Sequence, residues 1–498
     1  MKPARMSARL AGAGAGILLL AALALFLGLR ARWADHLLMW DEAMNLCAAR
    51  AFAAKGHDWF SDWFWRHPPA LNALLLLAEP LRAGFAGRAA AYLAGAGGAG
   101  AVLLFALNLL AFGRRAGLWS VFFLAVMPGA VFYDVWLKQE LLVAVFGVGA
   151  LLAWARGRAL LCGALLGLAM LSKATGALYA AGIALLALAR PASERRWKPL
   201  GLAAVTAVLV SGWWYLWFGS SFRFFFALVT GAPTARTDAE VWTQPFYYYL
   251  ARLPADLGWF GVALAAIGAV SCIGFLRDRT RSDCAWPLAV LLPSWILLGL
   301  ARAKAPWFGA MLYPALATLQ AVGADRVFVR VASAASLPPG WSRAVAVALA
   351  AGIVSWSTAA VWGRSYESLF AREEPNLYWG SAASRRAAET LNGVVRDRER
   401  VLITPMNYWT GADPIPCPIF TCYLKDLPVL VRPRDLSFEE FVRAVREYRI
   451  DWAMISPETG AGGDSLVGRI GQNQDLRVLA LDGAWIVRTT ALQEAAPD

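Results

Sequence analysis

Ionisable side chains in this very apolar chain gather in a few short polar intervals. Asp41 and Glu42 stand side by side in "MWDEAMN", and His67 precedes two prolines in "WRHPPALN". Further along, Lys173 interrupts the apolar stretch "LAMLSKATGALYA". A carboxylate can take a proton from an incoming nucleophile, and cations can stabilise the negative charge of a departing group. These residue types therefore fit a transfer reaction with an anionic leaving group.

Each of these residues also has a purely structural interpretation. Adjacent acids at the start of a helix favour its dipole. A histidine before Pro68 and Pro69 can simply mark a helix start, because proline suits the first helical turn. Lys173 is harder to explain in this way, since an apolar half-segment flanks it on each side.

The composition indicates a membrane protein. Hydrophobic residues make up 59% of the 498 residues and charged residues only 16%, which is too apolar for ordinary soluble domains. Runs near bilayer length recur at 10–29, 89–112, 200–218 and 343–362. The first run lacks a small-residue cleavage site after it, so we expect an uncleaved first span rather than a signal peptide. The sequence therefore predicts a polytopic α-helical membrane protein.

The net charge of +13 follows from membrane topology. Basic residues cluster in short loops such as 190–198 and 277–281. Placing them all on the cytoplasmic side gives one alternating path of about eleven spans, with the N-terminus inside. The charge therefore needs no nucleic acid as a partner.

Two domains are expected. The membrane domain covers residues 1–363 and has a long outer loop at 31–87. That loop contains "PALNALLLLAEPL", which is too short to cross a bilayer and predicts an interfacial helix. Residues 364–498 have a soluble composition, and in them "SFEEFVRAVREY" has a Ser cap and an apolar helical face. Strand-like runs around it predict a small α/β domain.

This topology places the C-terminal domain outside. In an oxidising compartment Cys417 and Cys422 could pair as a disulfide. The alternative is two free thiols in an inward-facing domain, which would require one miscounted span.

The same path brings the chemically capable residues to one face. Ionisable groups near the hydrocarbon boundary are costly, and they are usually paired or functional. Lys138 and Glu140 could instead be a structural pair, and cations at span ends can simply extend to the interface. We expect an active site at the outer interface that suits a lipid-phosphate substrate, built from Asp41, Glu42, His67, Lys138, Glu140, Lys173, Arg302 and Lys304.

Four segments in this order carry a family resemblance: "WDEAMNLCAARAFAAKGHDWF", "HPPALNALLLL", "LSKATG" and "ARAKAPWFGAMLYPALA". They resemble the successive signatures of polyprenyl-phosphate-sugar-dependent glycosyltransferases of the GT-C fold. This superfamily contains protein O-mannosyltransferases and lipid A aminoarabinose transferases. The match covers roughly residues 10–325, and it is the register of the four segments, rather than any single one, that is specific.

The resemblance implies an inverting transfer from a lipid-phosphate donor, sometimes assisted by a divalent metal. The essential acid of the first outer loop matches at Asp41, as the base that activates the acceptor, and Glu42 completes the pair. The position before the prolines is His in the mannosyltransferase branch and Lys in the aminoarabinose branch; here it is His67. The acid that closes the second outer loop matches at Glu140, where many relatives have Asp.

The resemblance also implies the contacts to the donor phosphate. The buried lysine matches at Lys173, and the cation before the late Tyr-Pro segment matches at Lys304. The sequence departs from the family at Lys138-Gln139-Glu140, which lacks the usual arginine. The expected donor-phosphate residues are Lys173, Lys304, Lys138 and Arg66, and the further site residues are His67, Glu140, Arg302 and Tyr313.

The function expected is therefore that of a bacterial inner-membrane glycosyltransferase with a periplasmic active site. A transporter or flippase for a lipid-linked sugar is the alternative, but such proteins tend to have paired half-chains and broken helices, which this sequence lacks. A third interpretation makes the spans an anchor for the C-terminal domain, although about eleven spans exceed what an anchor needs. The sugar, the acceptor (a protein, lipid A, another glycolipid or a polysaccharide) and the oligomeric state stay open.

Overall fold

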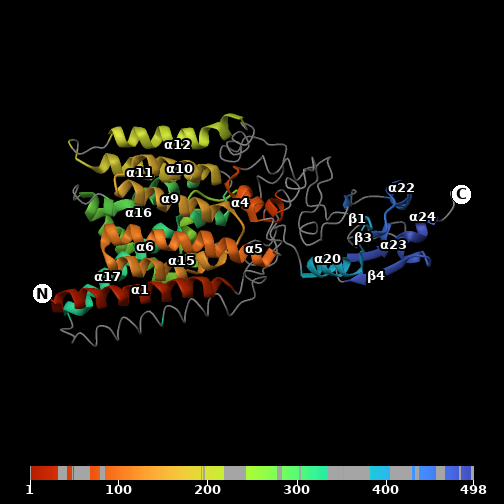
Figure 1. Cartoon of the computed structure of the whole chain (residues 1–498), viewed down its shortest axis with the longest axis horizontal. Helices are drawn as coiled ribbons and strands as arrows, with labels where there is room; N and C mark the ends of the chain where they lie inside the picture. Colours follow the sequence, from red (N-terminus) through yellow and green to blue (C-terminus); the bar gives the residue numbers. More distant parts are fainter. Residues whose placement is uncertain are drawn as a thin grey trace. The chain divides into compact units, whose positions relative to one another are not determined.

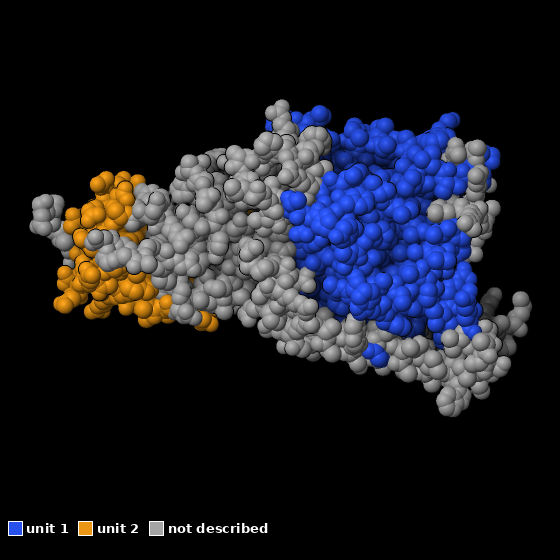
Figure 2. All heavy atoms as spheres, turned by 180° about the vertical axis from the view of Figure 1, so that it is seen from behind, with its two compact units in different colours: residues 1–35, 65–368 blue, residues 36–64, 369–498 orange. Residues whose placement is uncertain are grey.

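The computed structural model describes residues 2–31, 42–46, 49, 68–78, 85–191, 193, 197–217, 243–277, 283–301, 304–334, 352, 382–396, 398–403, 429–431, 437–455, 466–481 and 484–494. The chain divides into two compact units, which Figure 2 colours separately. The first comprises residues 1–35 and 65–368, and the second comprises residues 36–64 and 369–498. The boundary predicted between residues 363 and 364 lies outside the described residues.

The first unit is a bundle of long helices that run nearly parallel or antiparallel to one another (Figure 1). Its elements are α1 (Lys2–Ala31), α4 (Ala70–Ala78), α5 (Phe85–Tyr92), η2 (Leu93–Gly97), α6 (Gly98–Phe112), α7 (Arg114–Val126), α8 (Pro128–Tyr133), α9 (Gln139–Ala155), α10 (Ala159–Ser172), η3 (Ala174–Gly176), α11 (Ala177–Ala189), α12 (Trp197–Trp217), α15 (Tyr248–Arg277), α16 (Trp286–Leu300), η6 (Pro306–Leu312) and α17 (Tyr313–Ala334). Helix α7 packs against α1, α6 and α17, and α10 packs between α9 and α12.

The described helices have the lengths and surfaces of membrane spans. Four of them are long and apolar enough to cross a bilayer, and shorter apolar helices accompany them; the four are Arg88–Phe112, Trp197–Trp217, Tyr248–Phe275 and Asp283–Leu300. Large apolar side chains on α12 and α15 stay exposed, among them Leu209, Leu216 and Val270, as lipid-facing side chains do. The prediction of a multi-pass helical membrane protein is confirmed, and the count of about eleven spans stays a prediction.

Glycine allows two helices of the bundle to approach each other closely. Helices α15 and α17 meet where Gly268 faces the carbonyl of Leu319 and Gly323 faces the carbonyl of Leu264. A Cβ added at either glycine would clash with that backbone oxygen. Small residues at such crossings let two backbones approach, which is how helices associate in a membrane.

In the second unit, five strands among the described residues form one mixed sheet of order β2-β1-β3-β5-β4. Strands β1, β2 and β3 are parallel, and β5 is antiparallel to both of its neighbours. The strands are β1 (Val401–Ile403), β2 (Val429–Val431), β3 (Trp452–Ile455), β4 (Arg477–Leu481) and β5 (Ala484–Arg488), and the helices of this part are α20 (Ala382–Val394), α22 (Phe438–Tyr448), α23 (Leu466–Gln472) and α24 (Thr490–Glu494).

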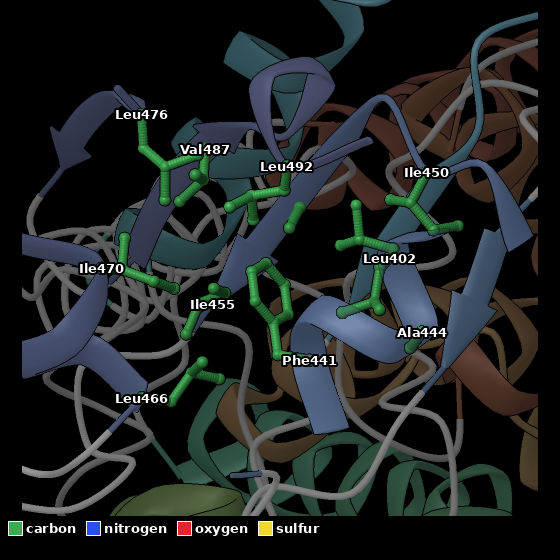
Figure 3. Packing of buried hydrophobic residues seen from close by; sticks show 12 residues of the cluster. Leu402, Phe441, Ala444, Ile450, Ile455, Leu466, Ile470, Leu476, Val487 and Leu492 are labelled. Atoms are coloured by element: carbon green, nitrogen blue, oxygen red, sulfur yellow. The ribbon is translucent and has the colours of Figure 1, made fainter. Parts of the chain in front are cut away.

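Helix α22 packs on this sheet through the apolar face that the sequence indicates. Phe441 lies among Leu402, Ile455 and Val487 in a core cluster that is almost fully buried (Figure 3). At the start of the helix the Ser437 side chain accepts from the Glu440 amide, and the Glu440 side chain accepts from the Ser437 amide. The predicted Ser cap is therefore confirmed. It stabilises the helix because it satisfies two amide groups that have no partner within the helix.

A first prediction concerns the α15–α17 contact. Gly268→Ala should destabilise the protein by about 1–3 kcal/mol, because the added methyl forces the two helices apart. Gly274→Ala, on the same helix, is the matched control, since nothing lies within 4 Å of its added Cβ. Thermal unfolding of the two variants in the same detergent measures the difference. Equal melting temperatures would contradict the packing argument.

A second prediction concerns the cap of α22. The backbone amide of Ser437 lowers the pKa of Glu440 below its ordinary value of 4.5. A carboxylate with a lowered pKa in the folded state stabilises fully above its unfolded pKa, and this contribution disappears as the pH falls through the folded pKa. In Ser437→Ala the amides of α22 should exchange with solvent faster at neutral pH, by an amount worth about 1 kcal/mol.

Hydrogen exchange of α22 in the full chain gives the measurement for this prediction. Glu440→Gln lacks the carboxylate charge, so its α22 amides should exchange faster than those of the wild type at neutral pH. This difference in exchange rate should shrink as the pH falls below 4.5, because the wild-type carboxylate then becomes protonated as well. A difference in exchange rate that stays constant with pH would mean that the Glu440 charge does not contribute to the cap.

Candidate functional site

Three of the predicted site residues come together where the start of α9 lies beside the end of α10. Lys138 is the residue that precedes α9, and Glu140 lies in the first turn of that helix, where a carboxylate suits the helix dipole. Lys173 ends α10 in an extended conformation, directly before the 3-10 turn η3. Its Nζ forms an ion pair with Glu140 Oε1. The outer turn predicted at "LSKATG" is therefore a break between α10 and α11.

Aromatic faces hold both lysines. Lys138 Nζ lies 3.9 Å from the ring centroid of Trp307, and Lys173 Nζ lies 4.3 Å from that of Phe308. Both rings belong to η6, which packs against α9. A cation over an aromatic face gains about 2 kcal/mol or more when it is desolvated. Lys138 is 4% exposed, so the Trp307 face is one of the contacts that hold its ammonium group in place.

Two buried polar atoms at this site have no hydrogen-bond partner among the described residues. They are Glu140 Oε2 and the hydroxyl of Thr175 in η3. Helix α9 contacts η3, so both atoms belong to the same junction. Buried polar atoms are nearly always paired in folded proteins, and an exception points to water, an ion or a ligand.

The segment before η6 is held differently. Lys304 lies in the connection between α16 and η6, where it donates to the carbonyls of Gln244 and Ala301. Burial lowers its pKa. Its described contacts are therefore to backbone oxygens, and no described contact joins it to Lys173.

Tyr313 begins α17 and is almost fully buried. Its hydroxyl has no hydrogen-bond partner among the described residues. The phenol packs on the bare backbone of Gly129, where an added Cβ would lie 2.6 Å from the hydroxyl. Beside it, Arg252 pairs with Asp256 and donates to the hydroxyl of Tyr133. Tyr313 thus lies in a second polar cluster, built from α8, α15 and α17.

The remaining predicted residues fall elsewhere. Glu42 lies in a short helical stretch, residues 42–46, and it is fully buried in the second compact unit. The predicted residues that lie outside the described part of the chain are Asp41, Arg66, His67, Arg302, Cys417 and Cys422.

Sequence analysis missed the aromatic partners of the lysines. Trp307 and Phe308 stand in the quoted segment "ARAKAPWFGAMLYPALA", but nothing in a sequence indicates which lysine lies over which ring. It also missed Arg30, Tyr92 and Asp134, whose contacts join segments far apart in the chain.

A divalent metal would need a set of acidic, histidine or cysteine ligands. Within the described part of the chain, no three His, Cys, Asp or Glu side chains come together in this way. The described residues therefore do not form a metal site by themselves.

A third prediction tests the ion pair. Lys173→Met leaves the Glu140 carboxylate buried without its charge partner, which should cost up to about 3–5 kcal/mol. The double variant Lys173→Met/Glu140→Gln should recover much of that loss, because no unpaired charge is left. Thermal unfolding in detergent measures both.

Arg115→Gln serves as the control for this prediction. It breaks the ion pair to Asp325, in which the arginine side chain is 52% exposed, so its effect should stay below about 1 kcal/mol. A Lys173→Met variant as stable as this control would mean that the pair with Glu140 does not contribute to stability.

Comparison with known proteins assigns the fold. No protein-family model matches the sequence, and no curated protein matches it. Among solved structures, ArnT from Cupriavidus metallidurans bound to undecaprenyl phosphate matches with a TM-score of 0.67 and 16% identity, over 97% of this chain and 99% of that one. Archaeal oligosaccharyltransferase AglB from Archaeoglobus fulgidus, in complex with an inhibitory peptide and a dolichol-phosphate, matches with a TM-score of 0.56 and 13% identity, over 89% of this chain and 69% of that one.

A third likeness is to the mycobacterial arabinofuranosyltransferase AftD, with a TM-score of 0.50 and 15% identity, over 94% of this chain and 39% of that one. These three proteins are glycosyltransferases with the same architecture. At such low identities the likeness concerns the fold, which agrees with the family resemblance of the four sequence segments. This chain has the GT-C fold.

Proposed function

We propose that this protein is a glycosyltransferase of the bacterial inner membrane that moves a sugar from a polyprenyl-phosphate donor to an acceptor on the periplasmic side. The observation that carries the proposal is the junction of Lys138, Glu140 and Lys173. Two ammonium groups and one carboxylate lie there, joined by an ion pair and held on aromatic faces, within a fold that ArnT shares in its complex with undecaprenyl phosphate. Ammonium groups held in this way can bind the phosphate of a lipid and release it again.

In the proposed reaction the acceptor hydroxyl or amine attacks the anomeric carbon of the donor sugar. Asp41 takes the proton of the acceptor, with Glu42 beside it in the acid pair. The bond between the anomeric carbon and the phosphate oxygen breaks, and polyprenyl phosphate departs with the bonding electrons. A single displacement of this kind inverts the configuration at the anomeric carbon.

The departing phosphate is stabilised by cations in this proposal. Lys138 and Lys173 offer ammonium groups that aromatic faces hold in place, so little reorganisation is needed as charge develops. Lys304 and Arg66 would add to the positive charge, and His67 and Arg302 would line the same region, whereas Tyr313 lies in the separate cluster of α8, α15 and α17. Glu140 Oε2 and the Thr175 hydroxyl, which lack partners among the described residues, would meet hydroxyl groups of the donor sugar.

The topology belongs to the same proposal. About eleven spans, with the N-terminus in the cytoplasm, place the acids and lysines on the periplasmic side and carry the small C-terminal α/β domain to that side as well. There Cys417 and Cys422 would form a disulfide. We assign the C-terminal domain a part in binding the acceptor.

A fourth prediction tests the reaction. Purified protein in lipid is given polyprenyl-phosphate hexose or aminopentose together with extracted envelope acceptors, and the products are read by mass spectrometry. Asp41→Asn should lower the transfer rate by about 10²–10⁴, because a positioned general base is lost. Binding of undecaprenyl phosphate should be unchanged.

Asp58→Asn, a neutralised acid in the same predicted loop, is the matched control and should transfer at the wild-type rate. If Asp41→Asn also kept near-normal turnover, Asp41 would not be the base. A folded wild-type protein that makes no product from any donor would refute the transferase and favour transport, which movement of labelled lipid across vesicles would then report.

A further inference from the structure

The segment that carries Lys138 has little regular backbone bonding of its own. Between the end of α8 and the start of α9, Asp134 N donates to Ala130 O at 3.0 Å, Trp136 N to Tyr133 O at 3.3 Å and Lys138 N to Trp136 O at 2.7 Å. Residues 134–138 are therefore neither helix nor strand. Such a segment depends on side chains for a fixed conformation, since its other backbone groups must find partners elsewhere.

One side chain fixes the beginning of this segment. The guanidinium of Arg30, which is fully buried, donates to Asp134 Oδ2 through Nε at 3.2 Å and through Nη2 at 2.9 Å. It also donates to the carbonyls of Leu124 and Ala125, both at 3.0 Å, and of Phe26 at 3.1 Å. Residues 124 and 125 lie in the last turn of α7, where carbonyls have no partner within the helix. One guanidinium thus ties α1, α7 and residue 134 together.

A second side chain fixes the end of the segment. The hydroxyl of Tyr92 donates to the carbonyl of Lys138 at 2.7 Å. Tyr92 is the last residue of α5, and the π-helical turn η2 (Leu93–Gly97) follows it directly. Such turns inside α-helical runs occur often at functional sites, because they shift which side chains face a given neighbour. Here the π-helical turn begins directly after Tyr92, the residue whose hydroxyl contacts the Lys138 carbonyl.

Stability alone gives a poor account of the Arg30–Asp134 pair. Apolar residues of similar volume often replace a buried ion pair without loss of stability, whereas the pair does specify one geometry. That geometry bears on the junction of Lys138 and Glu140, because Asp134 lies four residues before Lys138.

We propose that Arg30 and Tyr92 are positioning residues, which hold residues 134–138 and thereby set the places of the Lys138 ammonium and the Glu140 carboxylate. The inference rests on the proposed glycosyl transfer, in which these two groups face the donor. A misplacement of about 1 Å in an active site can cost about 10²-fold in rate. Loss of the Arg30 contact or of the Tyr92 contact should therefore lower the rate of transfer more than it lowers the stability of the protein.

Tyr92→Phe is the decisive variant, because it removes one hydroxyl and keeps the ring. Tyr215→Phe is its matched control: that hydroxyl donates to the carbonyl of Met170, also at 2.7 Å, but Met170 lies in the regular helix α10. For each variant we would measure kcat and KM for the polyprenyl-phosphate donor, the Kd of undecaprenyl phosphate, and the Tm.

The expected result is a kcat/KM at least about 10-fold lower in Tyr92→Phe than in Tyr215→Phe, with similar changes in Tm. Values of kcat/KM within two-fold of each other would overturn the proposal. A structural role alone would lower the Tm of Tyr92→Phe and leave kcat/KM near the wild-type value below that temperature.

The Arg30 contact is tested by the neutral double variant Arg30→Gln/Asp134→Asn, because Asp134→Asn alone leaves a buried charge and risks unfolding. A double variant with wild-type Tm and lowered kcat/KM supports the proposal, and one with wild-type kcat/KM overturns it for Arg30. Where this variant does not fold, Tyr92→Phe decides.

The two proposals fail in different ways. A wild-type protein that binds undecaprenyl phosphate and transfers no sugar refutes the proposed reaction. The ratio of Kd values for Tyr92→Phe and Tyr215→Phe then decides whether Tyr92 positions Lys138. A wild-type protein that neither binds this lipid nor transfers sugar overturns both.

Discussion

The ion pair between Glu140 and Lys173 is the constraint around which this end of the bundle is arranged. A lysine within an apolar segment has either to reach water or to find an anion, because a lone ammonium in apolar surroundings is very costly. The chain meets this need by ending α10 at Lys173 and starting α9 one residue before Glu140. The Lys173 ammonium also faces Phe308, which draws η6 to the same junction. Two helix ends and a 3-10 turn are thus joined by one cation.

Two other ionic contacts of the bundle also have a member at a helix end. Arg115 lies in the first turn of α7 and pairs with Asp325, and Arg190 follows the end of α11 and pairs with Asp283. A further pair, Arg252 with Asp256, lies within α15. Uncharged groups also join the helices: Asn108 donates to Thr318 and accepts from Trp286. Each of these charged side chains thus has a partner of opposite charge, as ionisable groups in apolar surroundings require.

How much of this could be predicted depended on the distance between partners along the chain. The cap at Ser437 and Glu440 spans three residues, so the sequence determines it locally. The meeting of Lys138, Glu140 and Lys173 followed from the alternation of apolar spans, which places every second connection on one face. The exact partners did not follow, because Glu140 pairs across 33 residues and Arg30 reaches Asp134 across 104. Pairings of that kind depend on how helices pack, and helix packing is set by side-chain shape rather than by a pattern of types.

The tyrosines near this junction show how a helical membrane protein can fix segments that are not helical. Hydroxyls of Tyr92, Tyr179 and Tyr249 donate to the carbonyls of Lys138, Met311 and Ala305, all in or beside the irregular connection before α9 and the 3-10 turn η6. A tyrosine suits this task because its ring packs in the apolar bundle while its hydroxyl reaches a polar backbone atom. Helices order themselves through their own hydrogen bonds, but the connections between them do not. Since the lysines and their aromatic partners stand on those connections, the precision of the cationic site comes from groups that the helices extend toward it.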